Sequence, residues 1–354
     1  MKPIKVLIVD DSALVRRILL RGLSDDPQIS IVGTAGDANR AQKLIEQTHP
    51  DVLTLDIEMP GTNGLIFLKH IMKNNPLPVI MVSALTQRGS RITLEALASG
   101  AVDFILKPMT NVKYNLSLML GELKSKIKMA AKANIMVFKN QTGVNRKPLA
   151  GQKISAAYLS SRIIAIGAST GGTRALRFLL GALPPDMPGM VVVQHMPAGF
   201  TFQFAQQLNA ETAFNVKEAQ SGDEVRPGHV LIAPGNFHLQ LVRHNKSYRV
   251  ICRAGARING YRPSVDVLFR SVAKHAGEHA IGIMLTGMGD DGADAMVKMR
   301  EKGAFTLAQD KDTSVVFGMP KEAYFRGGAM HLLPLSKIPE YVVKHLNQNM
   351  AWVH

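Results

Sequence analysis

The sequence is poor in cysteine. Cys252 is the one cysteine among 354 residues, so the chain cannot form an intrachain disulfide or a metal site built from cysteines alone. This usage is typical of a reducing compartment. We therefore expect the protein to act in the cytoplasm.

Long apolar runs are also missing. Apolar residues make up 46% of the chain, but no run approaches the roughly 18 residues that a membrane-spanning helix needs. The chain begins Met-Lys-Pro-Ile-Lys and enters a short apolar run at 6–9 that ends at two aspartates instead of a small-residue cleavage site. We expect no secretory signal and no direct insertion into a membrane.

Acidic residues are scarce relative to basic ones, which gives a formal net charge of +15. Part of the excess lies in one stretch, 124–153, that has no acidic residue. A solvated linker is the first interpretation, and a docking surface for an acidic partner is the second. No zinc-finger spacing or aromatic RNA-binding motif accompanies the charge, so we expect no nucleic-acid partner. The basic residues of this stretch are Lys124, Lys126, Lys128, Lys132, Lys139, Arg146, Lys147 and Lys153.

The length of the chain suggests two domains, and the apolar patterning supports this division. In the first part, short apolar runs alternate with helical periodicity, as in a doubly wound parallel sheet with helices on both faces. We predict five strands here. The runs are 6–9, 31–32, 52–55, 78–82 and 102–106.

The alternation stops at residues 126–158 and then resumes. Within that interval, 140–153 is rich in Gly, Asn, Gln and Lys, as expected of a linker. The sequence therefore predicts a first α/β domain over 1–125, a basic linker over 126–158 and a second α/β domain over 159–350. The sheet of the second domain should be mainly parallel, with antiparallel content suggested by closely spaced runs between 229 and 254. The later runs are 163–166, 190–193, 230–232, 239–242, 249–251 and 281–285.

Acidic side chains follow two strands of the first domain. Asp10 and Asp11 close the first run and Asp56 closes the third. The carboxyl ends of parallel strands meet at one edge of a sheet, where clustered carboxylates require a cation, and oxygen ligands suit Mg²⁺. Ser83 ends the fourth run and offers a hydroxyl, while Lys107, before Pro108, offers a positive charge able to hold a phosphoryl oxygen.

Each of these residues alone has an ordinary structural interpretation, as a helix cap or a turn. Together they resemble the response-regulator receiver family over residues 4–123. The resemblance implies that Asp56 accepts a phosphoryl group, that Asp11 and Asp56 bind Mg²⁺ with help from Asp10 and the Glu58 carbonyl, and that Ser83 and Lys107 contact the phosphoryl group. Phe104 would be the switch aromatic of this family, with plain core packing as an equal alternative. Asn63 stands where relatives often carry Asp.

A glycine-rich turn opens the second domain. The apolar run 163–166 is followed by Gly167-Ala168-Ser169-Thr170-Gly171-Gly172 and then by a helical pattern. Strand, sharp turn and helix with the spacing G-x-S-x-G are typical of a nucleophilic serine, and the helix N-terminus favours a developing oxyanion. A turn of this kind can equally bind phosphate.

A serine nucleophile needs a base and a group that orients it. His195 follows the run 190–193, whereas His238, His275 and His279 have surroundings typical of surface histidines. Asp290 and Asp291 follow the run 281–285, and either aspartate could reach His195. The alternative for both is to cap a helix that begins near Ala293. Serine, histidine and aspartate at three strand ends favour a catalytic triad.

The chain order Ser, His, Asp differs from the order Ser, acid, His of ordinary α/β-hydrolases. It resembles the catalytic domain of CheB-type protein-glutamate methylesterases over residues 160–348. The resemblance implies Ser169 as nucleophile, His195 as base, Asp291 as the orienting acid and the Met288 amide in the oxyanion hole. Tyr261 stands where relatives frequently have His, and Asp290 where they often have Asn. The matching segments are 167–172, Gln194-His195-Met196-Pro197, Arg262-Pro263-Ser264-Val265-Asp266 and 285–292.

Joined together, the two resemblances imply a phosphorylation-activated chemotaxis enzyme of a two-component system. Its substrates would be the methyl-accepting chemoreceptors, on which it would hydrolyse glutamate methyl esters and deamidate glutamines, and its phosphodonor would be a chemotaxis histidine kinase. We expect no cofactor at the esterase site, and we expect the unphosphorylated receiver to cover the Ser169 cleft. The alternative is a phospho-regulated module that binds an anion or a partner at 167–172 without catalysis.

Overall fold

The computed structural model describes residues 2–59, 63–84, 86–107, 112–137, 155–245 and 247–350. The chain divides into two compact units, residues 1–140 and 141–354. The central part of the predicted linker, 138–154, lies outside the described residues, as does Pro108. Within the described ranges, no helix is long and apolar enough to cross a bilayer.

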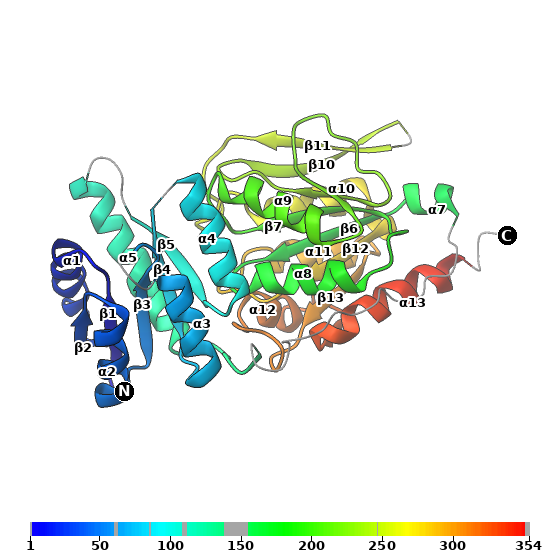
Figure 1. Ribbon diagram of the computed structural model, residues 1–354. Helices are drawn as coiled ribbons and strands as arrows, with labels where there is room; N and C mark the ends of the chain where they lie inside the picture. Colours follow the sequence, from blue (N-terminus) through cyan, green and yellow to red (C-terminus); the bar gives the residue numbers. More distant parts are fainter. Residues whose placement is uncertain are drawn as a thin grey trace. The chain divides into compact units, whose positions relative to one another are not determined.

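The first unit contains a five-stranded sheet in the order β2-β1-β3-β4-β5, and every neighbouring pair is parallel. This confirms the predicted doubly wound fold. Helices connect the strands, with α1 beside α5 and α3 beside α4 (Figure 1). The strands are β1 (Ile4–Val9), β2 (Ile29–Ala35), β3 (Val52–Asp56), β4 (Val79–Ser83) and β5 (Asp103–Leu106). The helices are α1 (Ala13–Ser24), α2 (Ala38–Thr48), α3 (Gly64–Asn74), α4 (Gln87–Ala98) and α5 (Val112–Ala130).

Local chemistry explains where these elements begin. The residues of β3 and β4 are all buried, as expected for strands covered by helices on both faces. Four helices begin directly after polar N-cap residues whose side chains accept a hydrogen bond from a backbone N–H. One of them is Asn63, which accepts from the Leu65 amide at 2.7 Å, a role that an aspartate would fill equally well. The four caps are Ser12, Asp37, Asn63 and Thr86.

The second unit is built on a seven-stranded sheet in the order β14-β13-β12-β6-β7-β9-β8, parallel throughout. A separate antiparallel pair, β10–β11, accounts for two of the closely spaced runs between 229 and 254, while the third run, β9, belongs to the parallel sheet. The strands are β6 (Ile163–Ala168), β7 (Gly189–Gln194), β8 (Asn215–Glu218), β9 (His229–Ile232), β10 (His238–His244), β11 (Ser247–Arg253), β12 (Ala280–Met284), β13 (Phe305–Gln309) and β14 (His331–Leu333).

Helices cover both faces of this sheet (Figure 1). α8 packs beside α9 and α13, and α10, α11 and α12 pack together. The strand order runs one way from β6 and the other way from β12, so the junction between these strands is a topological switch point. The helices are α7 (Ala156–Ser160), α8 (Gly172–Ala182), α9 (Phe200–Glu211), α10 (Val265–His275), α11 (Ala293–Glu301), α12 (Met319–Phe325) and α13 (Ile338–Met350), with 3₁₀ turns η1 (Gly277–His279) and η2 (Leu335–Lys337).

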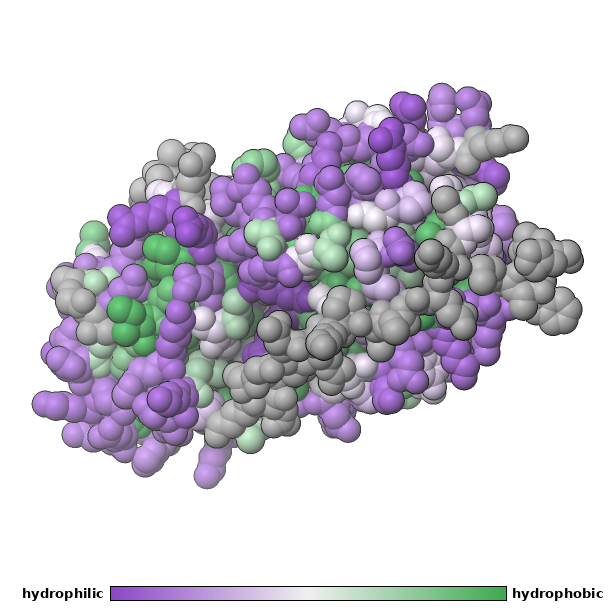
Figure 2. All heavy atoms as spheres, turned by 45° about the vertical axis from the view of Figure 1, so that its right-hand side comes forward, coloured by the Kyte–Doolittle hydropathy of each residue, from purple (hydrophilic) through white to green (hydrophobic). Residues whose placement is uncertain are grey.

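The core and the surface follow the expected partition. Three phenylalanines, Phe200, Phe204 and Phe269, are among the largest fully buried side chains. On the face shown in Figure 2, hydrophilic side chains dominate and hydrophobic ones form small scattered patches. Such scattered apolar residues are normal for a globular surface.

Candidate functional site

Ser169 lies immediately after β6, at the carboxyl edge of the parallel sheet. It is 8% exposed, and its backbone is held on two sides. Its N–H donates to the Thr286 carbonyl at 3.0 Å, and its carbonyl accepts a hydrogen bond from Gln194 Nε2 at 2.8 Å. These bonds tie the serine to the ends of both neighbouring strands, β12 and β7.

The glycines around Ser169 have distinct structural roles. Gly171 has a φ of 77°, and a Cβ there would lie 2.6 Å from Val315. The left-handed residue of the turn is therefore Gly171, while Ser169 itself has no positive φ. At Gly167 a Cβ would lie 2.4 Å from a methyl group of Val265, so this glycine allows close packing of β6 against the start of α10. The G-x-S-x-G spacing thus serves both a turn and a tight contact.

His195 is placed next to Ser169 by strand register. β6 and β7 are parallel neighbours with Ala168 opposite Gln194, so Ser169 and His195 follow as the next pair. Paired residues on adjacent strands lie about 5 Å apart and point to the same face of a sheet. The His195 N–H also donates to the Ala168 carbonyl at 3.1 Å, which continues the strand pairing up to the histidine.

The imidazole of His195 is 5% exposed and is held by Asp291. Its Nε2 lies 2.8 Å from Asp291 Oδ2, while Nδ1 is buried without a hydrogen-bond partner among the described residues. A neutral imidazole that donates from Nε2 carries its lone pair on Nδ1. The nitrogen available as a base is therefore Nδ1.

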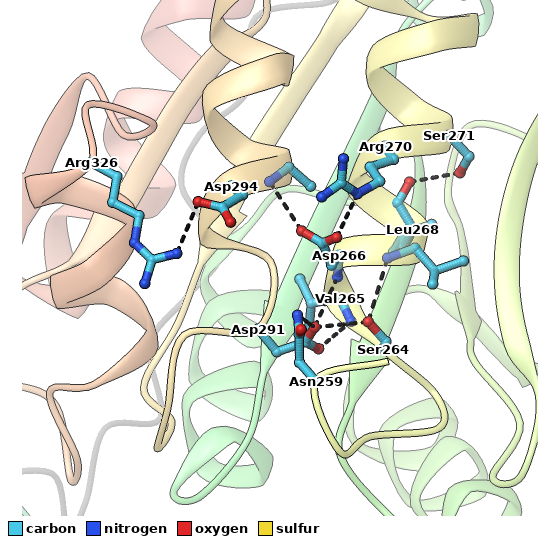
Figure 3. A network of polar contacts seen from close by, with 12 residues as sticks. Asn259, Ser264, Val265, Asp266, Leu268, Arg270, Ser271, Asp291, Asp294 and Arg326 are labelled. Carbon is cyan, nitrogen blue, oxygen red and sulfur yellow. Dashed lines mark hydrogen bonds and ion pairs between the residues drawn. The ribbon is translucent and has the colours of Figure 1, made fainter. Parts of the chain in front are cut away.

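Asp291 is fully buried at the centre of a polar network (Figure 3). Oδ2 also accepts from the Val265 amide at 2.6 Å, and Oδ1 accepts from Ser264 Oγ at 2.8 Å and from Asn259 Nδ2 at 3.0 Å. Burial favours the neutral acid, but hydrogen bonds from His195, Ser264 and Asn259 outweigh it and hold the pKa of Asp291 below its usual value. The carboxylate is thus ionised where it meets the imidazole.

The structure separates the two candidate aspartates. Asp290 is exposed and forms an ion pair with Arg326 at 2.7 Å, whereas Asp291 contacts His195. Neither side chain caps α11, because the N-cap residue is Gly292 and makes no side-chain bond. The helix near Ala293 is present as predicted, but helix capping does not explain the aspartates.

Gly287, the residue before Met288, lies against Ser169. A Cβ on Gly287 would lie 2.7 Å from the Ser169 Cβ, so the backbone after β12 touches the serine directly. Gly287 is held by the Val316 carbonyl, which accepts its N–H, and by the Gly318 and Met319 amides, which donate to its carbonyl. In the described part of the chain, the Met288 N–H donates to no backbone acceptor.

One expectation about the other histidines is wrong. His238 is buried, 6% exposed, and its Nε2 bonds the Ala256 carbonyl at 2.8 Å. His275 and His279 are half-buried and not fully exposed. Asn259 and Ser264, which surround Asp291, had no predicted role, although Ser264 lies in the matching segment 262–266 and the Asn259-Gly260 pair is a recognisable turn signal.

The first unit gathers its acidic residues as the strand ends require. One oxygen each of Asp10, Asp11 and Asp56 lies within 4.8 Å of the other two. Lys107 Nζ contacts Asp10 at 2.9 Å and Asp56 at 2.8 Å, which offsets only part of three negative charges. A set of oxygen ligands with excess negative charge fits a Mg²⁺ site.

Asp56 and Lys107 shift each other's pKa. Burial raises the pKa of the Asp56 carboxyl to about 6, although the ammonium of Lys107 opposes that shift. Burial also disfavours the charged form of Lys107, but contacts with Asp56 and Asp10 outweigh it and raise the pKa of the lysine. Lys107 therefore stays protonated beside Asp56.

Ser83 and Phe104 are buried near this edge. The Ser83 hydroxyl accepts from Thr93 Oγ1 at 2.8 Å and donates to the Ala84 carbonyl, so it is engaged locally and does not contact Asp56. Phe104 is 6% exposed, and the ammonium of Lys126 lies 5.4 Å from its ring centre. In this conformation Phe104 packs in the core, which is the alternative to a switch role.

The two units together define a response regulator whose second domain has the arrangement of a serine hydrolase. Comparisons with known proteins agree. Residues 6–116 match the response regulator receiver domain model, and residues 164–342 match the CheB methylesterase model.

Full-length relatives make the assignment specific. The chain is 51% identical to a protein-glutamate methylesterase/protein-glutamine glutaminase of Syntrophotalea carbinolica, over 98% of this chain and 99% of the relative. It is 47% identical to a protein of the same name from Geobacter metallireducens, over 96% and 94%. The crystal structure of the Thermotoga maritima CheB methylesterase catalytic domain matches with a TM-score of 0.51 and 43% identity, covering 52% of this chain and 98% of that one. The chain belongs to the CheB family of protein-glutamate methylesterases/protein-glutamine glutaminases.

Proposed function

We propose that the protein hydrolyses glutamate methyl esters, and deamidates glutamines, on the cytoplasmic parts of chemoreceptors during chemotaxis adaptation. The family membership supports this activity. The observation that carries it is the hydrogen bond of 2.8 Å between the buried side chains of His195 and Asp291, with His195 and Ser169 directly after the register pair Gln194–Ala168.

Ser169, His195 and Asp291 divide the chemistry between them. Ser169 Oγ attacks the side-chain carbonyl carbon of the substrate while His195 Nδ1 takes its proton. Asp291 keeps the other proton on Nε2 and stabilises the imidazolium that forms. The Met288 N–H, which faces no backbone acceptor, donates to the oxyanion.

The same groups complete the cycle. The imidazolium gives its proton from Nδ1 to the departing methoxide, which leaves as methanol, or to the amide nitrogen of a glutamine, which leaves as ammonia, and the acyl-enzyme remains. Water then attacks the acyl-enzyme while His195 accepts its proton, and the imidazolium returns that proton to Ser169 Oγ as the acyl bond breaks and the glutamate product leaves. Both reactions are acyl transfers through one intermediate.

The test is release of methanol from methyl-labelled chemoreceptors by the full chain, with Ser169→Ala as the comparison. The wild-type chain should release methanol and the folded variant should not. Unchanged activity in the variant would support a binding module at 167–172 and contradict the hydrolase.

We propose that the first unit is the switch of this enzyme and that Asp56 accepts a phosphoryl group from a chemotaxis histidine kinase. The acidic cluster, in which Asp10 and Asp56 are buried and Asp11 is exposed, supports this role. Asp10, Asp11, Asp56 and the Glu58 carbonyl would hold Mg²⁺, which neutralises charge on the incoming phosphoryl group. Lys107 and, after rotation of its hydroxyl, Ser83 would contact the phosphorylated side chain.

We propose the domain limits 1–125 and 159–350, joined by the basic linker 126–158. α5 continues to Ala130 and α7 begins at Ala156, so helical residues lie at both ends of the proposed linker. A switch that a kinase controls has to lie in the compartment where the phosphorylated kinase forms, so we propose that the protein acts in the cytoplasm.

A further inference from the structure

An aromatic ring outside the Ser-His-Asp set lies against His195. The ring of Tyr261 stacks on the imidazole with centroids 3.7 Å apart and planes inclined by 8°. Tyr261 is half-buried and belongs to the segment between β11 and α10. Contact this close and this parallel covers one whole face of the imidazole.

A tight turn fixes the position of that ring. Ile258 and Tyr261 exchange two backbone hydrogen bonds of 3.0 and 2.9 Å, and the residues between them, Asn259 and Gly260, have φ values of 52° and 84°. Positive φ at both central positions defines a type I′ turn, for which Asn-Gly is the favoured pair. The Arg257 side chain adds a bond of 3.1 Å to the Gly260 carbonyl.

The same turn holds Asp291. Asn259 Nδ2 donates to Asp291 Oδ1 at 3.0 Å, two residues before the ring that stacks on His195. One rigid turn therefore touches both Asp291 and His195, the carboxylate by a hydrogen bond and the imidazole by its face.

We infer that Tyr261 is a positioning residue that holds the imidazole of His195 in its productive plane and stabilises the imidazolium, a role that rests on the proposed hydrolase function. Among the described residues, His195 has one hydrogen-bonded ring nitrogen, Nε2, and a single bond leaves the ring free to tilt about it. The stacked ring removes that freedom and fixes the plane in which Nδ1 lies.

The stack also acts more strongly in the transition state than in the ground state. When Nδ1 takes the proton of Ser169, the imidazole becomes a cation against the negative face of an aromatic ring. An interaction that strengthens as the reaction proceeds raises kcat and leaves substrate binding unchanged. The ring face, and not the hydroxyl of Tyr261, carries this effect.

The experiment compares Tyr261→Leu with Tyr261→Phe in the full chain, using a methyl-labelled cytoplasmic receptor fragment as substrate. Leucine fills much of the space without a π face, and phenylalanine keeps the face. We expect kcat to fall about tenfold in Tyr261→Leu, as expected for loss of a stacked cation contact, with KM unchanged. Tyr261→Phe should keep kcat within about threefold of wild type, because its ring preserves the aromatic contact.

Tyr324→Leu is the matched control, since Tyr324 is 39% exposed and its ring packs edge-on against Phe325 and not against an imidazole. Thermal unfolding checks that each variant is folded, and Tyr261→Met replaces Tyr261→Leu if the latter does not fold. Wild-type kcat in the folded Leu or Met variant, a raised KM with unchanged kcat, or equal losses in Leu and Phe would each overturn the inference. Activity of the wild-type chain and its loss in Ser169→Ala report separately on the proposed function.

Discussion

Replacing Asp291 with asparagine separates the charge of the carboxylate from its hydrogen bonding. Two of the donors that cannot reverse, His195 Nε2–H and the Val265 amide, meet Oδ2, and the third, the Asp266 amide, meets Oδ1 at a longer 3.4 Å. The two shorter bonds to Oδ1 come from Ser264 and Asn259, whose hydroxyl and amide can turn to accept instead. An asparagine can therefore put its oxygen at the Oδ2 position and its NH₂ group at the Oδ1 position, and it loses only the long bond from Asp266.

This arrangement keeps the tautomer of His195 and removes the negative charge. We expect kcat to fall about 10²- to 10³-fold, or about 3 to 4 kcal/mol of transition-state stabilisation, less than the ~10⁴-fold loss typical when the tautomer is also wrong. Exchange of charge-assisted bonds for neutral ones should cost about 1 to 3 kcal/mol of folding stability. For a domain of this size that lowers Tm by roughly 2 to 4 °C per kcal/mol.

Methanol release measures kcat, and thermal unfolding measures stability. The pKa of Asp291 lies below 3.8, so its charged form stabilises the fold above that pH, and this contribution is lost as the pH falls through the folded-state pKa. The difference in Tm between wild type and variant should therefore narrow below pH 3.8.

Asp290→Asn is the control, because it breaks only the exposed pair with Arg326, and exposed pairs contribute about 0 to 1 kcal/mol. Its kcat should stay at the wild-type level. If Asp291→Asn kept wild-type kcat, or if Asp290→Asn lost as much, the assignment of Asp291 as the orienting acid would be refuted.

Three further outcomes test other parts of the molecule. Asp56→Asn should abolish phosphoryl incorporation from a small phosphodonor and the activation that follows, and removal of Mg²⁺ with a chelator should do the same to wild type; incorporation in the variant would place the acceptor elsewhere. Gly287→Ala should lower kcat by about 10- to 100-fold, because displacement of a nucleophile is costly. The new Cβ would lie 2.4 Å from the Met319 sulfur and 2.7 Å from the Ser169 Cβ. Unchanged kinetics would mean that this backbone does not fix the serine. A chain lacking residues 1–140 should release methanol faster than the unphosphorylated full chain, and equal or slower release would contradict inhibition by the receiver.

Much of the architecture follows from short-range patterns. Apolar runs of two to five residues between helical segments made the parallel sheets predictable, because a strand covered on both faces has to be continuously apolar. Strands β8, β13 and β14 escaped prediction. β13 contains Thr306 and Gln309, which are buried because the Gly328 carbonyl and the Thr286 amide satisfy them. Only the folded chain supplies those partners.

Antiparallel content was predicted near 229–254, but the assignment of each run was not. β9 joins the parallel sheet while β10 and β11 form a separate two-stranded sheet. All three runs carry similar apolar residues, and what separates them is which neighbour each strand meets. That choice depends on the packing of α10 against β10, which no local pattern reports.

The sequence by itself determined which residues stand at strand ends: the acidic side chains near Asp10 and Asp56, the glycine-flanked Ser169, and His195. It did so because parallel strands bring their carboxyl ends to one edge whatever the details of packing. Tertiary structure decided that Asp291 and not Asp290 meets the imidazole, that Nδ1 is the nitrogen left as a base, and that Tyr261 covers its face. These are contacts between segments 30 to 100 residues apart, as with the 96 residues between His195 and Asp291, and their geometry is set only when the helices and strands pack together.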